Sequence, residues 1–178
     1  MGHFEKTLDS ETIYDGKIIK VLRDRALLED GSSTLREVVR HKGASAVLAL
    51  DSGGNAFFVK QFRYPIGQTL LEAPAGKLDP GEEPLACAKR ELREECGLEA
   101  AKWTELGPML SSPGFCDEVI WLFLAGELSE VGQNLDEDEF LDVVKIPLAE
   151  ARQMVLSGAV PDAKTQVLVL KAAEKSDN

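Results

Sequence analysis

The chain has 178 residues, of which 44% are hydrophobic and 29% charged, the composition of an ordinary globular protein with one main core. Its 31 acidic and 20 basic residues give a net charge of -11, which argues against a broad DNA- or RNA-binding role. No run of about 18 apolar residues is present, so a membrane span is excluded, and residues 1–10 lack the regions of a secretory signal. We therefore expect a cytoplasmic protein.

The first third of the chain has the pattern of β-strands. Strands are expected over 17–30 and 34–51, with Asp30-Gly31 as the turn between them, and a third over 55–65. A loop rich in proline and glycine follows over 72–81.

A helix is expected from about Pro84 to Cys96, because proline suits a first turn and Gly97 suits the left-handed residue after the end. Its buried stripe is predicted from helical spacing to be Leu85, Ala88, Leu92 and Cys96. The three cysteines include no CxxC pair, which argues against a disulfide framework and a zinc site and favours small buried residues over a catalytic thiol.

The remainder predicts strands over 119–128 and 143–147, an acidic stretch over 136–142 and a helical tail from about Leu148. Strands dominate and few of them are joined by helices. This favours an α+β fold in which helices flank a mixed sheet.

Three glutamates of the expected helix predict a metal site. Glu91 and Glu95 are four residues apart, and Glu94 is three beyond Glu91, so the carboxylates share one face and repel one another. A hard divalent cation with oxygen ligands, Mg²⁺ or Mn²⁺, would relieve that repulsion. The alternative is a solvated helix face with an Arg90–Glu94 salt bridge.

The segment 76–98, GKLDPGEEPLACAKRELREECGL, resembles the Nudix box G-x5-E-x7-R-E-U-x-E-E-x-G-U, with U aliphatic, at every defined position. The resemblance implies the Nudix fold, an α/β/α sandwich around a mixed sheet with an N-terminal antiparallel strand region. We expect residues 1–42 to form that region and 43–178 the Nudix hydrolase domain. The matching positions are Gly76, Glu82, Arg90, Glu91, Leu92, Glu94, Glu95, Gly97 and Leu98.

The resemblance also implies roles for these residues. Glu91 and Glu95 would bind Mg²⁺ together with the Ala75 carbonyl, and Glu94 would be a further ligand or would orient water. Arg90 would orient the glutamates, and Glu82 would support the loop before the helix. A metal ion suits diphosphate hydrolysis because it neutralises the phosphoryl oxygens and activates water.

Outside the box the chain resembles the ADP-ribose pyrophosphatase subfamily in the segments 38–50, 59–82 and 111–118, and Pro113 falls sixteen residues after Gly97, as in that subfamily. The implied reaction is Mg²⁺-dependent hydrolysis of ADP-ribose to AMP and ribose 5-phosphate. Another nucleoside diphosphate sugar, a nucleoside triphosphate or a non-catalytic ADP-ribose-sensing role are the alternatives.

Further site residues follow from the same resemblance. Arg36, Arg63 and Glu118 are expected to contact the substrate, although both arginines also suit an ordinary surface strand. In the acidic run 136–139, Glu137 resembles the general base and Glu139 an extra metal ligand, and an ordinary solvated loop is the alternative.

The subfamily commonly forms two-fold dimers that exchange N-terminal strands. The long strand-rich N-terminus here is compatible with a homodimer in which Arg36 and Glu118 serve the neighbouring active site. The expected partners are therefore a nucleotide sugar and a second copy of the chain, with no nucleic acid and no membrane.

Overall fold

The computed structural model describes residues 3–135 and 140–176. The chain forms two compact units. Unit 1 consists of Met1–Gly43 and Leu110–Val119, and unit 2 consists of Ala44–Met109 and Ile120–Asn178.

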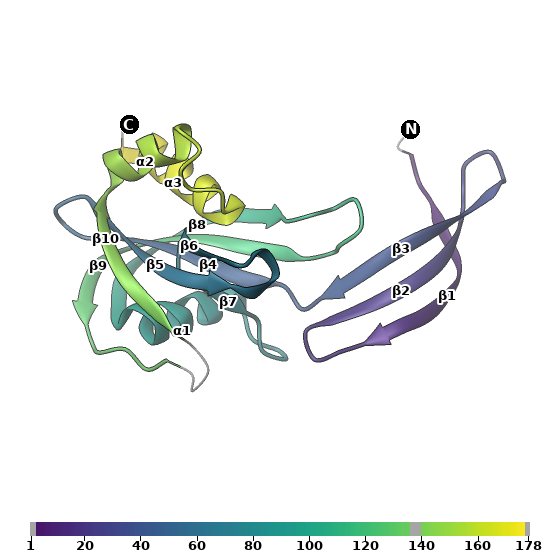
Figure 1. Ribbon diagram of the computed structural model, residues 1–178, viewed down its shortest axis with the longest axis horizontal. Coiled ribbons are helices and arrows are strands. Elements are labelled where there is room, and N and C mark those ends of the chain that lie inside the picture. The colour runs from purple at the N-terminus through teal and green to yellow at the C-terminus, as the bar shows by residue number, and fades with distance from the viewer. Residues whose placement is uncertain (1–2, 136–139, 177–178) are drawn as a thin grey trace. The chain divides into compact units, whose positions relative to one another are not determined.

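Unit 1 is an antiparallel three-stranded sheet in the order β1 (Lys6–Asp15), β2 (Ile19–Leu27), β3 (Ser33–His41), as Figure 1 shows. The turn predicted at Asp30-Gly31 is present, with Gly31 at φ +84°. The sequence pattern did not predict β1, because all ten of its residues are exposed and no apolar alternation marks a core face.

The single strand predicted over 34–51 is wrong, because the chain divides there between the two units. β3 ends at His41, and β4 (Ala44–Leu50) begins in unit 2. Gly43, at φ +85°, supplies the left-handed residue at this junction, a conformation that glycine adopts without steric cost.

Unit 2 is built on a seven-stranded mixed sheet. Its main path runs β10-β5-β4-β9-β8, with β6 paired to β5 and β7 to β4, and β4 and β9 are parallel. The predicted loop over 72–81 therefore contains a short strand, β7. The strands are β4, β5 (Asn55–Arg63), β6 (Gln68–Glu72), β7 (Ala75–Lys77), β8 (Leu98–Leu110), β9 (Val119–Glu130) and β10 (Leu141–Pro147).

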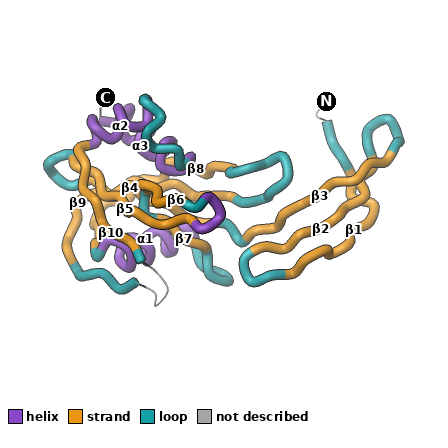
Figure 2. The backbone as a smooth tube through the Cα atoms, in the orientation of Figure 1, coloured by secondary structure: helices purple, strands orange, loops and turns teal. Residues whose placement is uncertain are grey.

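Three helices cover this sheet, α1 (Pro84–Cys96) on one face and α2 (Leu148–Leu156) with α3 (Ala163–Ser176) on the other (Figures 1 and 2). The alternation of β4 serves both layers: Leu48 joins the core under α2 and α3, and Val47 joins the core under α1. The predicted α+β fold, an α/β/α sandwich around a mixed sheet, is confirmed. None of the described helices is long and apolar enough to cross a membrane.

The helix α1 has the predicted bounds. It starts at Pro84 and ends at Cys96, and the following Gly97 has a φ of +66° and donates its N–H to the Arg93 carbonyl at 2.9 Å. The stripe prediction is wrong for Leu85, which is 37% exposed and lines an open hollow with Trp103 and Trp121 of the sheet. The helix residues that are buried are Cys87, Ala88, Glu91, Leu92, Glu95 and Cys96.

Gly97 gives a test of this packing. A β-carbon there would lie 2.7 Å from the Gln133 nitrogen and 2.8 Å from the Gly132 carbonyl carbon, both backbone atoms. We expect Gly97→Ala to lower the free energy of unfolding in urea by at least about 2 kcal/mol, since left-handed strain and overpacking add.

Gly158→Ala is the matched control, because Gly158 also follows a helix at positive φ (+80°) but has no atom within 4 Å of an added β-carbon. Its free energy of unfolding should fall by only about 1 kcal/mol, the cost of the left-handed conformation alone. If both variants lose the same free energy of unfolding, the backbone at 132–133 moves to accommodate the added methyl group without cost.

Candidate active site

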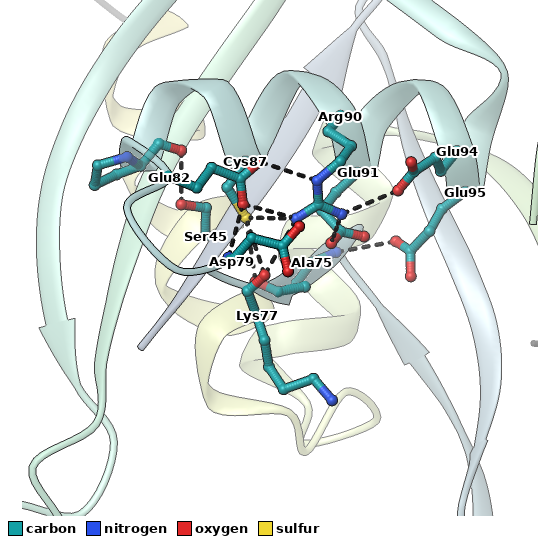
Figure 3. A network of polar contacts seen from close by, with 12 residues as sticks. Ser45, Ala75, Lys77, Asp79, Glu82, Cys87, Arg90, Glu91, Glu94 and Glu95 are labelled. Atoms are coloured by element: carbon teal, nitrogen blue, oxygen red, sulfur yellow. Dashed lines mark hydrogen bonds and ion pairs between the residues drawn. The ribbon is translucent and has the colours of Figure 1, made fainter. Parts of the chain in front are cut away.

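Arg90, in the middle of α1, ties the helix to the loop before it. Its Nε and Nη2 donate to the two carboxylate oxygens of Glu82, each at 2.9 Å. Its Nη1 donates to Glu91 at 2.6 Å and to Glu94 at 3.0 Å, so one guanidinium bridges three carboxylates (Figure 3). Glu82 also accepts from the backbone N–H of Asp79 at 3.0 Å, which closes the loop onto the helix.

Glu91 occupies a space that a glycine leaves for it. A β-carbon on Gly76 would lie 1.7 Å from Glu91 Oε1. The backbone of β7 and the carboxylate can therefore approach each other only because residue 76 has no side chain. Glu91 is 7% exposed as a result.

Glu95, one turn further along α1, is fastened to the same strand. Its Oε2 accepts the backbone N–H of Ala75 at 3.0 Å (Figure 3), and Glu95 is 2% exposed. Ala75 pairs with Ala46 of β4. The residue whose carbonyl was expected to bind metal thus lies in a strand of the central sheet, beside one of the expected carboxylate ligands.

The electrostatics of the site follow from these contacts. The hydrogen bonds from Arg90 lower the pKa of Glu82 to about 2, and the same carboxylate raises the pKa of Arg90. Burial, assisted by the charges of Glu82 and Glu91, raises the pKa of Cys87 to about 12. Cys87 is therefore a protonated thiol at neutral pH, which argues against a catalytic thiolate.

The carboxylate cluster has the donor chemistry of a divalent metal site. Its oxygens are the hard ligands that Mg²⁺ and Mn²⁺ prefer, and the close approach at Gly76 shapes a cradle around Glu91. The Arg90–Glu94 bridge of the alternative interpretation is present, but Glu91 and Glu95 are buried, unlike residues of a solvated face. Within 3–135 and 140–176, no three His, Cys, Asp or Glu side chains are arranged to hold a metal ion, and Arg90 is paired with both Glu91 and Glu94.

Arg63, at the end of β5, belongs to unit 2 as the box does. Its Nε and Nη2 donate to the two oxygens of Glu72 on β6, both at 2.7 Å. The hydrogen bonds to Glu72 raise the pKa of Arg63, and the charges of Glu72, Asp162 and Glu95 add to this effect. The sequence analysis did not single out Glu72, although a charged residue inside the apolar run LLEAP was the available signal.

Arg36 and Glu118 lie in unit 1. Arg36 donates to both carboxylate oxygens of Glu5, at 2.7 and 3.0 Å, and Glu118 is 3.2 Å from Nδ1 of His41. The neighbouring Asp117 accepts from the His41 backbone N–H at 2.9 Å. Glu137 and Glu139 lie outside the described residues.

Comparison with known proteins identifies the family. A family model for the NUDIX domain matches residues 39–169, and one for the nucleoside diphosphate sugar hydrolase N-terminal domain matches residues 5–39. The chain therefore belongs to the Nudix family, as the box predicts.

Particular relatives span nearly the whole chain. The chain is 47% identical to an ADP-ribose pyrophosphatase of Bacillus subtilis (strain 168), with 95% of each chain covered. It is 41% identical to a methanol dehydrogenase activator of Bacillus methanolicus, over 93% of this chain and 90% of the relative. A crystal structure of an ADP compounds hydrolase shares the fold, with a TM-score of 0.83, 21% identity, and coverage of 98% of this chain and 96% of that one.

The contact between Gly76 and Glu91 can be tested through metal affinity. In Gly76→Ala the new methyl group must displace the Glu91 carboxylate. We expect Mn²⁺, followed by electron paramagnetic resonance of the free ion, to bind at least about tenfold more weakly. The free energy of unfolding should change by less than about 1.5 kcal/mol, because the displaced atoms end a flexible side chain.

Gly126→Ala is the control, because the nearest atom to an added β-carbon there is the Leu50 carbonyl oxygen at 4.0 Å. It should leave the Mn²⁺ affinity unchanged. Unchanged affinity in Gly76→Ala as well would contradict the role of this contact.

Proposed function

We propose that this chain is an Mg²⁺-dependent hydrolase that cleaves the diphosphate of ADP-ribose to AMP and ribose 5-phosphate. The observation that carries the proposal is the carboxylate cluster of α1, in which Glu91 and Glu94 pair with Arg90 and Glu95 accepts a hydrogen bond from the backbone of β7. The 47% identical relative named ADP-ribose pyrophosphatase supports the choice of substrate.

Four groups of this site fit a divalent cation: the carboxylates of Glu91, Glu94 and Glu95 and the carbonyl of Ala75. Mg²⁺ suits them, and Mn²⁺ is the expected substitute. When bound, such an ion neutralises phosphoryl oxygens and lowers the pKa of coordinated water. Arg90 keeps the carboxylates in place through its bond to Glu82.

The remaining roles belong to residues that bind substrate or move a proton. Arg63 would donate to phosphate oxygens, and Glu94 would orient the water that attacks phosphorus. As the P–O bond of the bridging oxygen breaks, a carboxylate takes the proton of that water. We assign this base to Glu137 and a further metal ligand to Glu139, both outside the described residues.

Unit 1 supports a homodimer. β1 forms one edge of its sheet, and apolar side chains such as Ile13 and Tyr14 are more than half exposed on it. A second copy of unit 1 would cover these side chains. Arg36 would donate to phosphate oxygens in the dimer, and Glu118 would accept from ribose hydroxyls or the adenine amino group.

A substrate panel tests the proposed function. With Mg²⁺ present, ADP-ribose should have a kcat/KM at least about tenfold above ADP-glucose, GDP-mannose, UDP-glucose and deoxynucleoside triphosphates, about 1.4 kcal/mol in activation free energy. Product AMP is quantified by chromatography, and EDTA should abolish its formation.

Two variants attribute the activity to this site. Glu95→Gln should lose most turnover while keeping the fold, and Glu99→Gln, on an exposed carboxylate just beyond α1, should keep it. If another substrate of the panel has the highest kcat/KM, the chain is still a diphosphate hydrolase, but ADP-ribose is not its preferred substrate. No turnover of any substrate would favour a ligand-sensing role.

Light scattering tests the dimer. At micromolar concentration we expect twice the mass of one chain, and Ile13→Glu should shift the protein towards the monomer by placing a charge on the exposed apolar strand. Leu156→Glu is the control, since Leu156 is equally exposed on α2. A monomeric mass for the unmodified chain would rule the dimer out.

A further inference from the structure

A row of alternating charges runs through unit 2 from the end of β5 to the start of α3. Arg63 pairs with Glu72 through two hydrogen bonds of 2.7 Å, and Lys164 donates to the same Glu72 carboxylate. Lys164 also donates to Asp162 at 3.0 Å. The order along the row is thus Arg63, Glu72, Lys164, Asp162.

Glu72 is the most buried member of this row, and the residues on either side of it are more exposed. The Arg63 side chain is 40% exposed, whereas Glu72 is 2% and Lys164 is 10% exposed. A carboxylate as buried as that of Glu72 needs compensating charge and hydrogen bonds, and here two cations supply them. Burial raises the pKa of Glu72, but the bonds to Arg63 and Lys164 outweigh it and the net pKa is lowered.

This arrangement leaves one side of the Arg63 guanidinium available. Nε and Nη2 are committed to Glu72, and none of the hydrogen bonds found within 3–135 and 140–176 uses Nη1. A planar fork held by two of its nitrogens presents the third in a fixed direction, which suits a phosphate oxygen.

The same end of α3 also holds the backbone near the box. Thr165, which is fully buried, accepts the N–H of Ala73 at 2.7 Å and donates to Asp162 at 2.5 Å. Ala73 precedes Ala75 by two residues, and the N–H of Ala75 donates to Glu95. One short segment, 162–165, therefore fastens both the arginine pair and the strand beside the carboxylates.

We propose that Lys164 is a positioning residue for substrate binding, which it supports by sharing Glu72 with Arg63 and so fixing the guanidinium that meets the diphosphate. This inference rests on the proposed function, in which Arg63 contacts substrate. A purely structural role would lower stability alone, whereas a positioning role raises KM in protein that is fully folded.

The test is steady-state kinetics on Lys164→Met with the best substrate of the panel. We expect KM to rise about tenfold or more with kcat within about threefold, because the arginine binds ground state and transition state alike. Lys164→Arg should restore KM to within about threefold of the original. Lys175→Met, on an exposed lysine of the same helix, should change nothing.

A double-mutant cycle with Arg63→Gln shows whether Lys164 acts through Arg63. In the Arg63→Gln background, Lys164→Met should change KM by less than about twofold. The same change in both backgrounds, or an unchanged KM in Lys164→Met, would overturn the inference. If Lys164→Met does not fold, Lys164→Gln and Asp162→Asn, which weaken the same contacts, are measured against the same criteria.

The two proposals fail in different ways. An unmodified protein that does not hydrolyse ADP-ribose contradicts the proposed function, and the cycle is then run with whichever substrate it does hydrolyse. An unmodified protein that hydrolyses ADP-ribose while Lys164→Met keeps its KM contradicts the positioning role only.

Discussion

The ion pairs of Arg90 are the interaction on which the site in unit 2 depends. Three glutamates within five residues of α1 would repel one another on one helix face, and two of them are buried. Arg90 supplies the compensating charge to Glu91 and Glu94 and uses its other nitrogens to hold Glu82 in the preceding loop. Arg90 therefore orders the loop, the helix and two of the three carboxylates, and the third, Glu95, is held by the backbone N–H of Ala75.

Close approach of backbone and side chain is the second condition of the site. Gly76 lets a strand of the central sheet lie against Glu91, and Gly97 lets the backbone of residues 132–133, which follow β9, pack against the end of the helix. At both positions a methyl group would meet atoms closer than 3 Å. The two glycines of the box thus serve packing as much as backbone conformation, since Gly76 has no left-handed φ.

Another buried carboxylate of unit 2, that of Glu72, is also stabilised by paired cations. Glu72 is as buried as Glu95 and is neutralised from both sides, by Arg63 towards solvent and by Lys164 from the core. The Arg63 pair and the carboxylates of α1 belong to the same unit, and the charge of Glu95 contributes to the raised pKa of Arg63. An acidic chain can in this way hold an anionic substrate with few arginines, each placed by a carboxylate.

The sequence by itself determined α1, its start at Pro84 and its termination before Gly97, and the gathering of its glutamates beside Arg90, because these features depend on helical spacing over a few residues. Only the tertiary structure decided which partners distant in sequence the other charged residues take. Lys164 reaches Glu72 across 92 residues of chain, and Arg36 reaches Glu5 across 31. Helical and strand periodicity relate only residues that are close in sequence, so they cannot predict pairs at such separations. β1 gave no signal for a different reason: its residues are all exposed, and pairing with β2, not a buried face, makes it a strand.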